Sequence, residues 1–129
     1  MIIEVVGALI HDAQGRLLTV RKANTERFML PGGKREPGED DLVALARELK
    51  EELSVQLVTA EPVGVFEAAA ANETGARVRS HPYRVTVVGE IVAAAEIAEL
   101  RWIDPAAPDV ALAPLLMTQI LPALRRSAG

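Results

Sequence analysis

The sequence predicts a fold of the α+β or α/β class, with a mixed β-sheet between helices. Runs of β-branched and apolar residues, which are typical of strands, stand on both sides of a charged amphipathic segment, and a second amphipathic segment follows the last of them. The order strands, helix, strands, helix most simply gives one sheet covered by helices on its two faces. The chain contains no internal repeat and no long linker, so we expect a single domain over residues 1–129.

Three short strands are expected before the first helix. Ile2 to Ile10 and Leu17 to Arg21 are rich in β-branched and apolar residues, and turn-forming residues lie between them. We therefore predict that these two segments pair as an opening hairpin. A third strand, Arg27 to Leu30, leads into Pro31-Gly32-Gly33, where proline stiffens the chain and glycine permits unusual backbone angles. A loop is expected to follow.

The segment after this loop is predicted to be an amphipathic helix that ends at Leu53. Asp40 or Asp41 is the expected N-cap, because an aspartate side chain can accept a hydrogen bond from a free N–H of the first turn. The apolar positions recur at spacings of three and four, which places them on one face of a helix that we expect to pack on the core: Leu42, Leu45, Leu49 and Leu53.

The second half of the chain is expected to add strands and a final helix. Val55 to Val58, Val63 to Phe66, Tyr83 to Val92 and Leu100 to Ile103 have strand-like composition and would extend the sheet. An amphipathic pattern from Leu115 to Arg125 predicts the last helix.

Composition narrows the possible functions. The absence of cysteine excludes disulfides, thiol nucleophiles and thiolate zinc sites, so a metal would need oxygen or nitrogen ligands. A formal net charge of −4 with scattered basic residues argues against binding to a nucleic acid polymer. The apolar run Met1 to Ile10 contains Glu4, lacks a basic leader and is too short to span a bilayer. We expect no membrane association and a cytoplasmic location.

Three carboxylates share one side of the predicted helix. Glu48, Glu51 and Glu52 fall within one third of its circumference, and Glu48 and Glu52 form a like-charge pair four residues apart. Such a cluster near a helix C-terminus destabilises the helix, and a divalent cation that prefers oxygen ligands would offset this cost. Arg47 is placed to orient one of the carboxylates. The alternative interpretation is a charged helical face that is simply solvated.

The residues before and within this helix carry a family resemblance. A glycine-rich loop precedes the acidic helix, and the spacing of the fixed positions is that of the Nudix box: Gly33, Glu39, Arg47-Glu48-Leu49, Glu51-Glu52 and Val55. The chain therefore resembles Nudix hydrolases. One position departs from the pattern, because Ser54 stands where the family usually has glycine. A left-handed conformation is common just past a helix end, and serine there would cost about 1 kcal/mol.

The resemblance implies an α/β/α sandwich and a site for magnesium, with manganese as a possible substitute. It implies that the metal is held by four groups of the motif and by a further acidic residue from a loop before the last strand: Glu48, Glu51, Glu52, the carbonyl of Gly33, and Glu96. The general base would be Glu48 in first place and Glu52 in second, with Arg47 and Glu39 in supporting roles. A solvated loop acid is the alternative for Glu96.

The implied reaction is hydrolysis of a diphosphate linkage in a nucleoside di- or triphosphate. Arg21 and Lys22 end the second strand near the expected site and are candidates for contacts with phosphate. Leu112 lies where enzymes that clear oxidised purine nucleotides often have an asparagine that reads the base, so it is a candidate for substrate specificity. Two alternatives stay open, an ADP-ribose or nucleotide-sugar pyrophosphatase and an inactive nucleotide- or metal-binding module. The protein is expected to be a monomer or homodimer.

Overall fold

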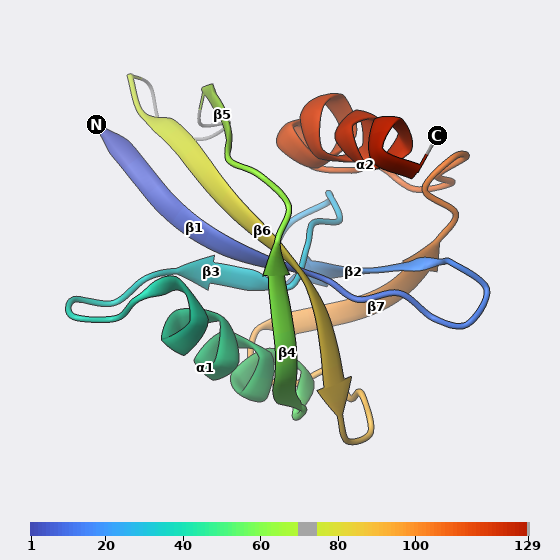
Figure 1. The fold of residues 1–129 in the computed structure, drawn as a ribbon, viewed down its shortest axis with the longest axis horizontal. Helices are drawn as coiled ribbons and strands as arrows, with labels where there is room; N and C mark the ends of the chain where they lie inside the picture. The colour runs from blue at the N-terminus through green and yellow to red at the C-terminus, as the bar shows by residue number, and fades with distance from the viewer. Residues whose placement is uncertain (70–74, 129) are drawn as a thin grey trace.

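The computed structural model describes residues 1–69 and 75–128, and within them the strands form two sheets (Figure 1). The larger sheet is mixed and five-stranded, and it consists of β1 (Ile2–Leu9), β3 (Gly32–Lys34), β4 (Gln56–Pro62), β5 (Phe66–Ala69) and β6 (Arg77–Val88). The smaller sheet pairs β2 (Leu17–Lys22) with β7 (Ile97–Ile103) in antiparallel orientation.

Strands β1 and β6 form the centre of the larger sheet. They run parallel over eight paired positions, among them Val5 opposite Ser80. The other edge of β1 pairs with β3, which places Gly33 opposite Val6. β6 is long enough to pair with both β4 and β5 along its second edge. The long strand β6 therefore lies between β1 on one side and β4 and β5 on the other.

Helix α1 (Asp41–Leu53) covers one face of the larger sheet. The predicted N-cap is confirmed, because Asp40 Oδ1 accepts a hydrogen bond from the Val43 backbone N–H at 2.9 Å. Ser54 ends the helix with φ 61° and ψ 30°, in the left-handed region. Leu42 was wrongly placed on the core face: it is 45% exposed, because Asp41 is the residue that faces the sheet in the first turn. The remaining predicted core positions are fully buried: Leu45, Leu49 and Leu53.

The C-terminal helix lies across the sheets from α1 (Figure 1). It begins with a π-helical segment, η1 (Leu116–Ile120), and continues as α2 (Leu121–Ala128). The Leu121 N–H bonds to the Leu116 carbonyl, five residues back. Pro122 has no N–H for a regular bond, and the wider turn before it accommodates this loss. In the described part of the chain, no helix combines the length and the hydropathy needed to cross a membrane.

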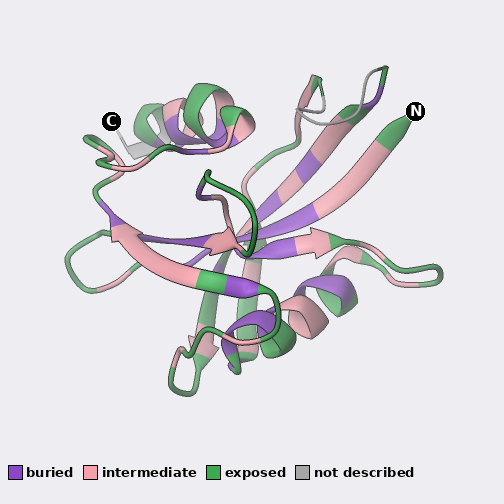
Figure 2. Ribbon diagram, turned by 180° about the vertical axis from the view of Figure 1, so that it is seen from behind, coloured by how far each residue is buried: buried purple, intermediate pink, exposed green. Residues whose placement is uncertain are grey.

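The two helices bury two separate groups of apolar side chains, and Figure 2 shows the buried parts facing the interior. Under α1 the core includes Leu45 and Leu49 together with Val6 and Val85 from the larger sheet. Under the C-terminal helix, a second cluster collects Leu116, Ile120 and other apolar residues. This arrangement, with a mixed sheet between helices, confirms the predicted α/β/α sandwich.

The predicted opening hairpin is wrong beyond its turn. The Leu18 N–H donates to the Ile10 carbonyl at 2.9 Å, and a single bridge joins His11 to Leu17. Past this point β2 pairs with β7, because both edges of β1 are occupied by β3 and β6. The expectation of one sheet is corrected in the same way, since the pair of β2 and β7 forms a sheet of its own.

Three other predicted strands are displaced along the chain. Arg27 to Leu30 forms only isolated bridges, and the strand lies later, at Gly32–Lys34, where a loop was expected. Val63 to Phe66 is replaced by Phe66–Ala69. The strand predicted at Tyr83 to Val92 runs instead from Arg77 to Val88, because the polar residues that alternate along its first half hid the pattern of a buried strand.

Candidate active site

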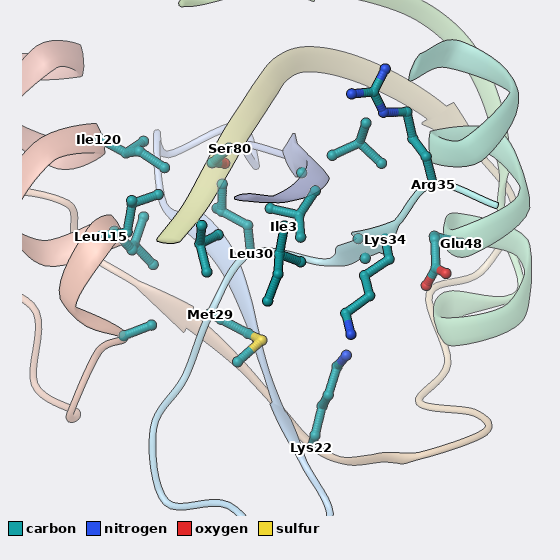
Figure 3. Close-up of a pocket in the computed structure, with 18 of the residues that line it drawn as sticks. Ile3, Lys22, Met29, Leu30, Lys34, Arg35, Glu48, Ser80, Leu115 and Ile120 are labelled. Carbon is teal, nitrogen blue, oxygen red and sulfur yellow. The ribbon is translucent and has the colours of Figure 1, made fainter. Parts of the chain in front are cut away.

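A cavity of about 800 Å³ opens between the larger sheet and the C-terminal helix (Figure 3). Charged side chains gather at one end, and they come from β2, β3, α1, the loop after β3 and the segment before β7: Lys22, Lys34, Arg35, Glu48 and Glu96. The other end is formed by aliphatic side chains: Ile3, Leu30, Leu115 and Ile120. The cavity therefore joins a charged region to an apolar chamber.

Gly33 and Glu48 approach each other closely at the charged end. A Cβ atom on Gly33 would lie 2.9 Å from the carboxyl carbon and from Oε2 of Glu48, closer than real Cβ contacts allow. Gly33 does not have a positive φ, so the requirement for glycine here is one of space. The Glu48 carboxylate thus lies directly against the backbone of β3.

Glu52 lies behind this contact and is buried, with 2% of its surface exposed. Its Oε1 accepts a hydrogen bond from the Gly32 N–H at 3.0 Å, whereas Oε2 has no hydrogen-bond partner among the described residues. Burial raises the pKa of Glu52 to about 7, against the opposing effect of the Gly32 N–H. A buried carboxylate oxygen without a partner is costly, and a cation or a proton would satisfy it.

Arg47 holds two carboxylates in place. Its guanidinium donates to both oxygens of Glu39, at 2.7 and 2.9 Å, and to Glu48 Oε1 at 2.7 Å. A further bond of 3.1 Å reaches the carbonyl of Lys34, so the same side chain also ties α1 to β3. The two-point contact with Arg47 lowers the pKa of Glu39 to about 2. Arg47 and Glu39 therefore contact each other beside Glu48, and their supporting roles stay predictions.

The three carboxylates of the motif do not form a tight cluster. Glu51 is the outermost, with 54% of its side chain exposed and Oε2 3.5 Å from the Arg47 guanidinium. Among the described residues, no three histidine, aspartate or glutamate side chains lie close enough together to hold a metal ion. The donor chemistry nevertheless fits a hard divalent cation, because Glu52 presents an unpartnered carboxylate oxygen and Glu48 lies against the Gly33 backbone.

Lys22 and Glu96 are brought to the same cavity, although they come from different parts of the chain. The Lys22 ammonium lies 3.2 Å from Glu96 Oε1. The Glu96 side chain is 61% exposed, and its backbone carbonyl accepts a hydrogen bond from the Ala23 N–H. Both residues line the charged end of the cavity.

Arg21 and Leu112 are not brought to the site. Arg21 pairs with Glu99 at 3.4 Å and donates to the Thr25 carbonyl at 3.0 Å, and it does not line the cavity. Leu112 is only 4% exposed and packs in the core under the C-terminal helix, next to Phe28. Neither residue lines the cavity, so the geometry gives no support to a role for them in substrate binding.

Sequence reasoning missed several residues that line the cavity, among them Lys34 and Ser80. Lys34 follows Gly33 directly, and Figure 3 shows its ammonium group pointing toward that of Lys22. Its position in the glycine-rich loop was the available signal. Ser80 is a buried polar residue on the wall of the chamber, and it escaped notice because the strand that carries it was expected to begin at Tyr83.

Comparisons with known proteins agree with the fold and with the motif. The model of the NUDIX domain family matches residues 1–124. The CTP pyrophosphohydrolase of Escherichia coli (strain K12) is 35% identical over 107 residues, which are 80% of this chain and 76% of that protein.

Solved structures show the same similarity. The solution structure of the E. coli ORF135 protein superposes with a TM-score of 0.84 at 30% identity, and the match covers 99% of this chain and 91% of the other. The crystal structure of MutT NUDIX hydrolase from Burkholderia pseudomallei gives a TM-score of 0.80 at 24% identity, over 94% and 95% of the two chains, and supports the fold.

These matches confirm the resemblance carried by the motif. They make the protein a hydrolase that acts on phosphorus-containing anhydrides, in a family whose members use divalent metal ions and small nucleotide substrates. The residues that the family model matches include the whole motif and both sheets of the fold. The chain therefore belongs to the NUDIX domain family.

Proposed function

We propose that this protein hydrolyses a diphosphate linkage of a nucleoside di- or triphosphate in the presence of magnesium. The observation that carries this proposal is the cavity itself, in which a charged end continues into an apolar chamber. The charged end suits a phosphate chain, and the chamber suits the nucleoside attached to it. The CTP pyrophosphohydrolase relative supports a nucleotide in this role.

Lys22 and Lys34 are proposed to bind the phosphate oxygens. Two ammonium groups that point toward each other repel, and an anion between them removes this repulsion. Glu96, which pairs with Lys22 at 3.2 Å, is exposed enough to move away when phosphate takes its place. Glu96 would then be free to join the metal ligands, as the family resemblance implies.

The metal would be held by Glu48, Glu51, Glu52 and the carbonyl of Gly33, with manganese able to replace magnesium. When bound, it supplies charge neutralisation on the phosphate oxygens and a lowered pKa for water. Arg47 fixes the orientation of Glu48 through its 2.7 Å bond.

A carboxylate of the chain accepts the proton of the attacking water. Glu48 is the first candidate, because it lines the cavity. Glu52 is the second, because its raised pKa of about 7 suits a base that works near neutral pH, although it lies behind Gly32.

The test is release of pyrophosphate, phosphate and nucleoside monophosphate from a panel of substrates, with magnesium, with manganese and with neither. The panel includes CTP and the other ribo- and deoxyribonucleoside triphosphates, oxidised nucleotides and ADP-ribose. We expect metal-dependent cleavage of a nucleoside di- or triphosphate and its loss in Glu48→Gln. A preference for ADP-ribose would replace the proposed substrate class, and the absence of any cleavage would favour a binding module. The monomeric or homodimeric state, the lack of a nucleic acid partner and the cytoplasmic location stay predictions.

A further inference from the structure

Ser80 is a buried polar side chain in the wall of the apolar chamber. It lies on β6, is only 4% exposed and lines the cavity on the side that faces the C-terminal helix (Figure 3). No hydrogen bond joins its hydroxyl to another described residue, although a hydroxyl offers one donor and two acceptor sites. Because Ser80 lines the cavity, its hydroxyl can donate a hydrogen bond to a ligand group there or accept one from it.

The surroundings of Ser80 are apolar. Its neighbours across the sheet are Val5 on β1 and Phe66 on β5, and Leu115 and Ile120 face it from the C-terminal helix. None of the described residues that line the cavity is aromatic, so a base in this chamber contacts aliphatic surfaces rather than stacking on a ring. The charged side chains lie at the opposite end, where the phosphates are proposed to bind.

We propose that Ser80 reads the base of the substrate and that the chamber thereby favours pyrimidine over purine nucleotides. This inference rests on the proposed function, because it needs the phosphates at the charged end and the nucleoside in the chamber. It deepens that function by naming the substrate class and a residue that determines specificity.

The preference follows from the number of polar groups that the chamber can satisfy. A single hydroxyl can pair with one or two groups on the edge of a base. A purine nucleotide carries the N7 acceptor of its imidazole ring in addition to the polar groups of its six-membered ring, so more of its polar groups would lose water without gaining a partner. A pyrimidine leaves fewer polar groups unpaired, because its remaining edge is short and its ring faces suit aliphatic walls.

The experiment compares kcat/KM for CTP, UTP, ATP and GTP in the wild type and in Ser80→Ala, with magnesium present. Calorimetric titration of CMP and AMP into the metal-free proteins gives a second readout that does not depend on turnover. Ser80→Thr keeps the hydroxyl. Val78→Ala, two residues away on the same strand and also in the cavity wall, changes the apolar surface without removing a polar group.

We expect the wild type to prefer pyrimidine nucleotides. Ser80→Ala should lower kcat/KM for them about three- to tenfold, the effect of one neutral hydrogen bond, and change the values for ATP and GTP far less. CMP affinity should fall by a similar factor, Ser80→Thr should retain the preference, and Val78→Ala should affect all four nucleotides alike. Melting temperatures within a few degrees of wild type would show that Ser80→Ala folds.

Either of two results overturns the inference without touching the proposed function. One is a wild type that cleaves nucleotides but does not favour pyrimidines, and the other is a Ser80→Ala variant with the wild-type preference. A wild type that cleaves no nucleotide at all overturns both proposals, so the two failures are distinguishable.

Discussion

The Tyr83 hydroxyl donates a 2.7 Å hydrogen bond to Asp41 Oδ2, which ties the first turn of α1 to the middle of β6. Around this pair, Arg35 lies 3.2 Å from Asp41, and His81 lies 2.8 Å from Glu4. Arg35 also lines the cavity, so the network connects the loop before α1 with the sheet. The helix that carries the acidic residues is therefore positioned by polar contacts at its start and by leucines further along.

The first prediction concerns the ionisation of Tyr83, the one tyrosine of the chain. Burial, followed by the hydrogen bond to Asp41, raises its pKa from 10.0 to about 12. Ultraviolet absorbance of tyrosinate should therefore rise with a midpoint near 12 in the folded protein. Because the folded pKa is raised, the contribution of this group to stability is complete below pH 10 and is lost as the pH rises toward 12.

The control is Asp41→Asn, which should move the midpoint back toward 10, since the carboxylate that opposes ionisation is gone. Circular dichroism followed in parallel reports whether the chain is still folded at each pH. A wild-type midpoint close to 10 in the folded protein would contradict the observed contact.

The second prediction is that Glu52→Gln separates stability from activity. The amide oxygen can still accept the hydrogen bond from Gly32, while the buried charge is removed. Turnover should fall by about two orders of magnitude or more, the contribution expected of a general base or of a metal ligand. The melting temperature of the metal-free variant should equal or exceed that of the wild type.

The effect of this substitution on stability should depend on pH in a defined direction. The pKa of Glu52 is raised to about 7 in the fold, so its contribution to stability is complete below pH 4.5 and is lost as the pH rises toward 7. Glutamine does not titrate. The difference in melting temperature, variant minus wild type, should therefore grow over this range and level off above it. A constant difference would show that burial does not raise the pKa of Glu52.

The third prediction is that Gly33→Ala damages the site without unfolding the protein. The added methyl would lie 2.9 Å from the Glu48 carboxyl group, which must move, and a displacement of about 1 Å can lower turnover about a hundredfold. Stability should change little, because Gly33 has no positive φ and the obstructing atoms are the end of a flexible side chain.

Gly38→Ala is the matched control in the same loop. It has φ +83° but nothing within 4 Å of an added Cβ, so it should lower stability by about 1 kcal/mol and leave Glu48 in place. Steady-state kinetics and thermal melts on both variants make the comparison. Equal loss of turnover in the two would mean that general disturbance of the loop, rather than the contact with Glu48, is responsible.

The parts of the fold that depend on local sequence could be predicted. Asp40 and the leucines of α1 predict the helix and its cap, because capping and amphipathic spacing act within a few residues. The pairing of β2 with β7 joins Leu17 to Ile103, and no local pattern encodes a choice of partner so far along the chain. The start of β6 was also missed, since its polar side chains form ion pairs over the sheet instead of facing water in a simple alternation.

The candidate site likewise has one part that local sequence predicts and another that it does not. Gly33, Arg47 and Glu48 lie within one continuous motif, so their spacing in sequence fixes their proximity in space. Lys22 and Ser80 reach the cavity from separate strands, and only the assembled sheets bring them to the same cavity as the motif. Arg21 and Leu112 were plausible as neighbours of the site, but Arg21 pairs with Glu99 and Leu112 is buried in the core, so neither lines the cavity.

The final prediction concerns Ser54, the residue that departs from the usual motif. It has φ 61° and ψ 30°, a left-handed conformation that costs about 1–2 kcal/mol for a residue with a Cβ atom. Ser54→Gly should remove this strain, and the greater freedom of glycine in the unfolded chain offsets part of the gain. We expect a net stabilisation of about 0.5–1 kcal/mol, seen as a rise in melting temperature of about 2–4 °C. Turnover should stay at the wild-type level, because Ser54 does not line the cavity.

Asn24→Gly is the comparison that identifies the cause. Asn24 has nearly the same backbone angle, φ 65°, but asparagine tolerates this conformation better than serine does. Relief of left-handed strain therefore predicts a smaller stabilisation at position 24 than at position 54. A Ser54→Gly variant that melts at or below the wild-type temperature would mean that serine ends α1 without strain, and that its departure from the motif has no energetic consequence for the fold.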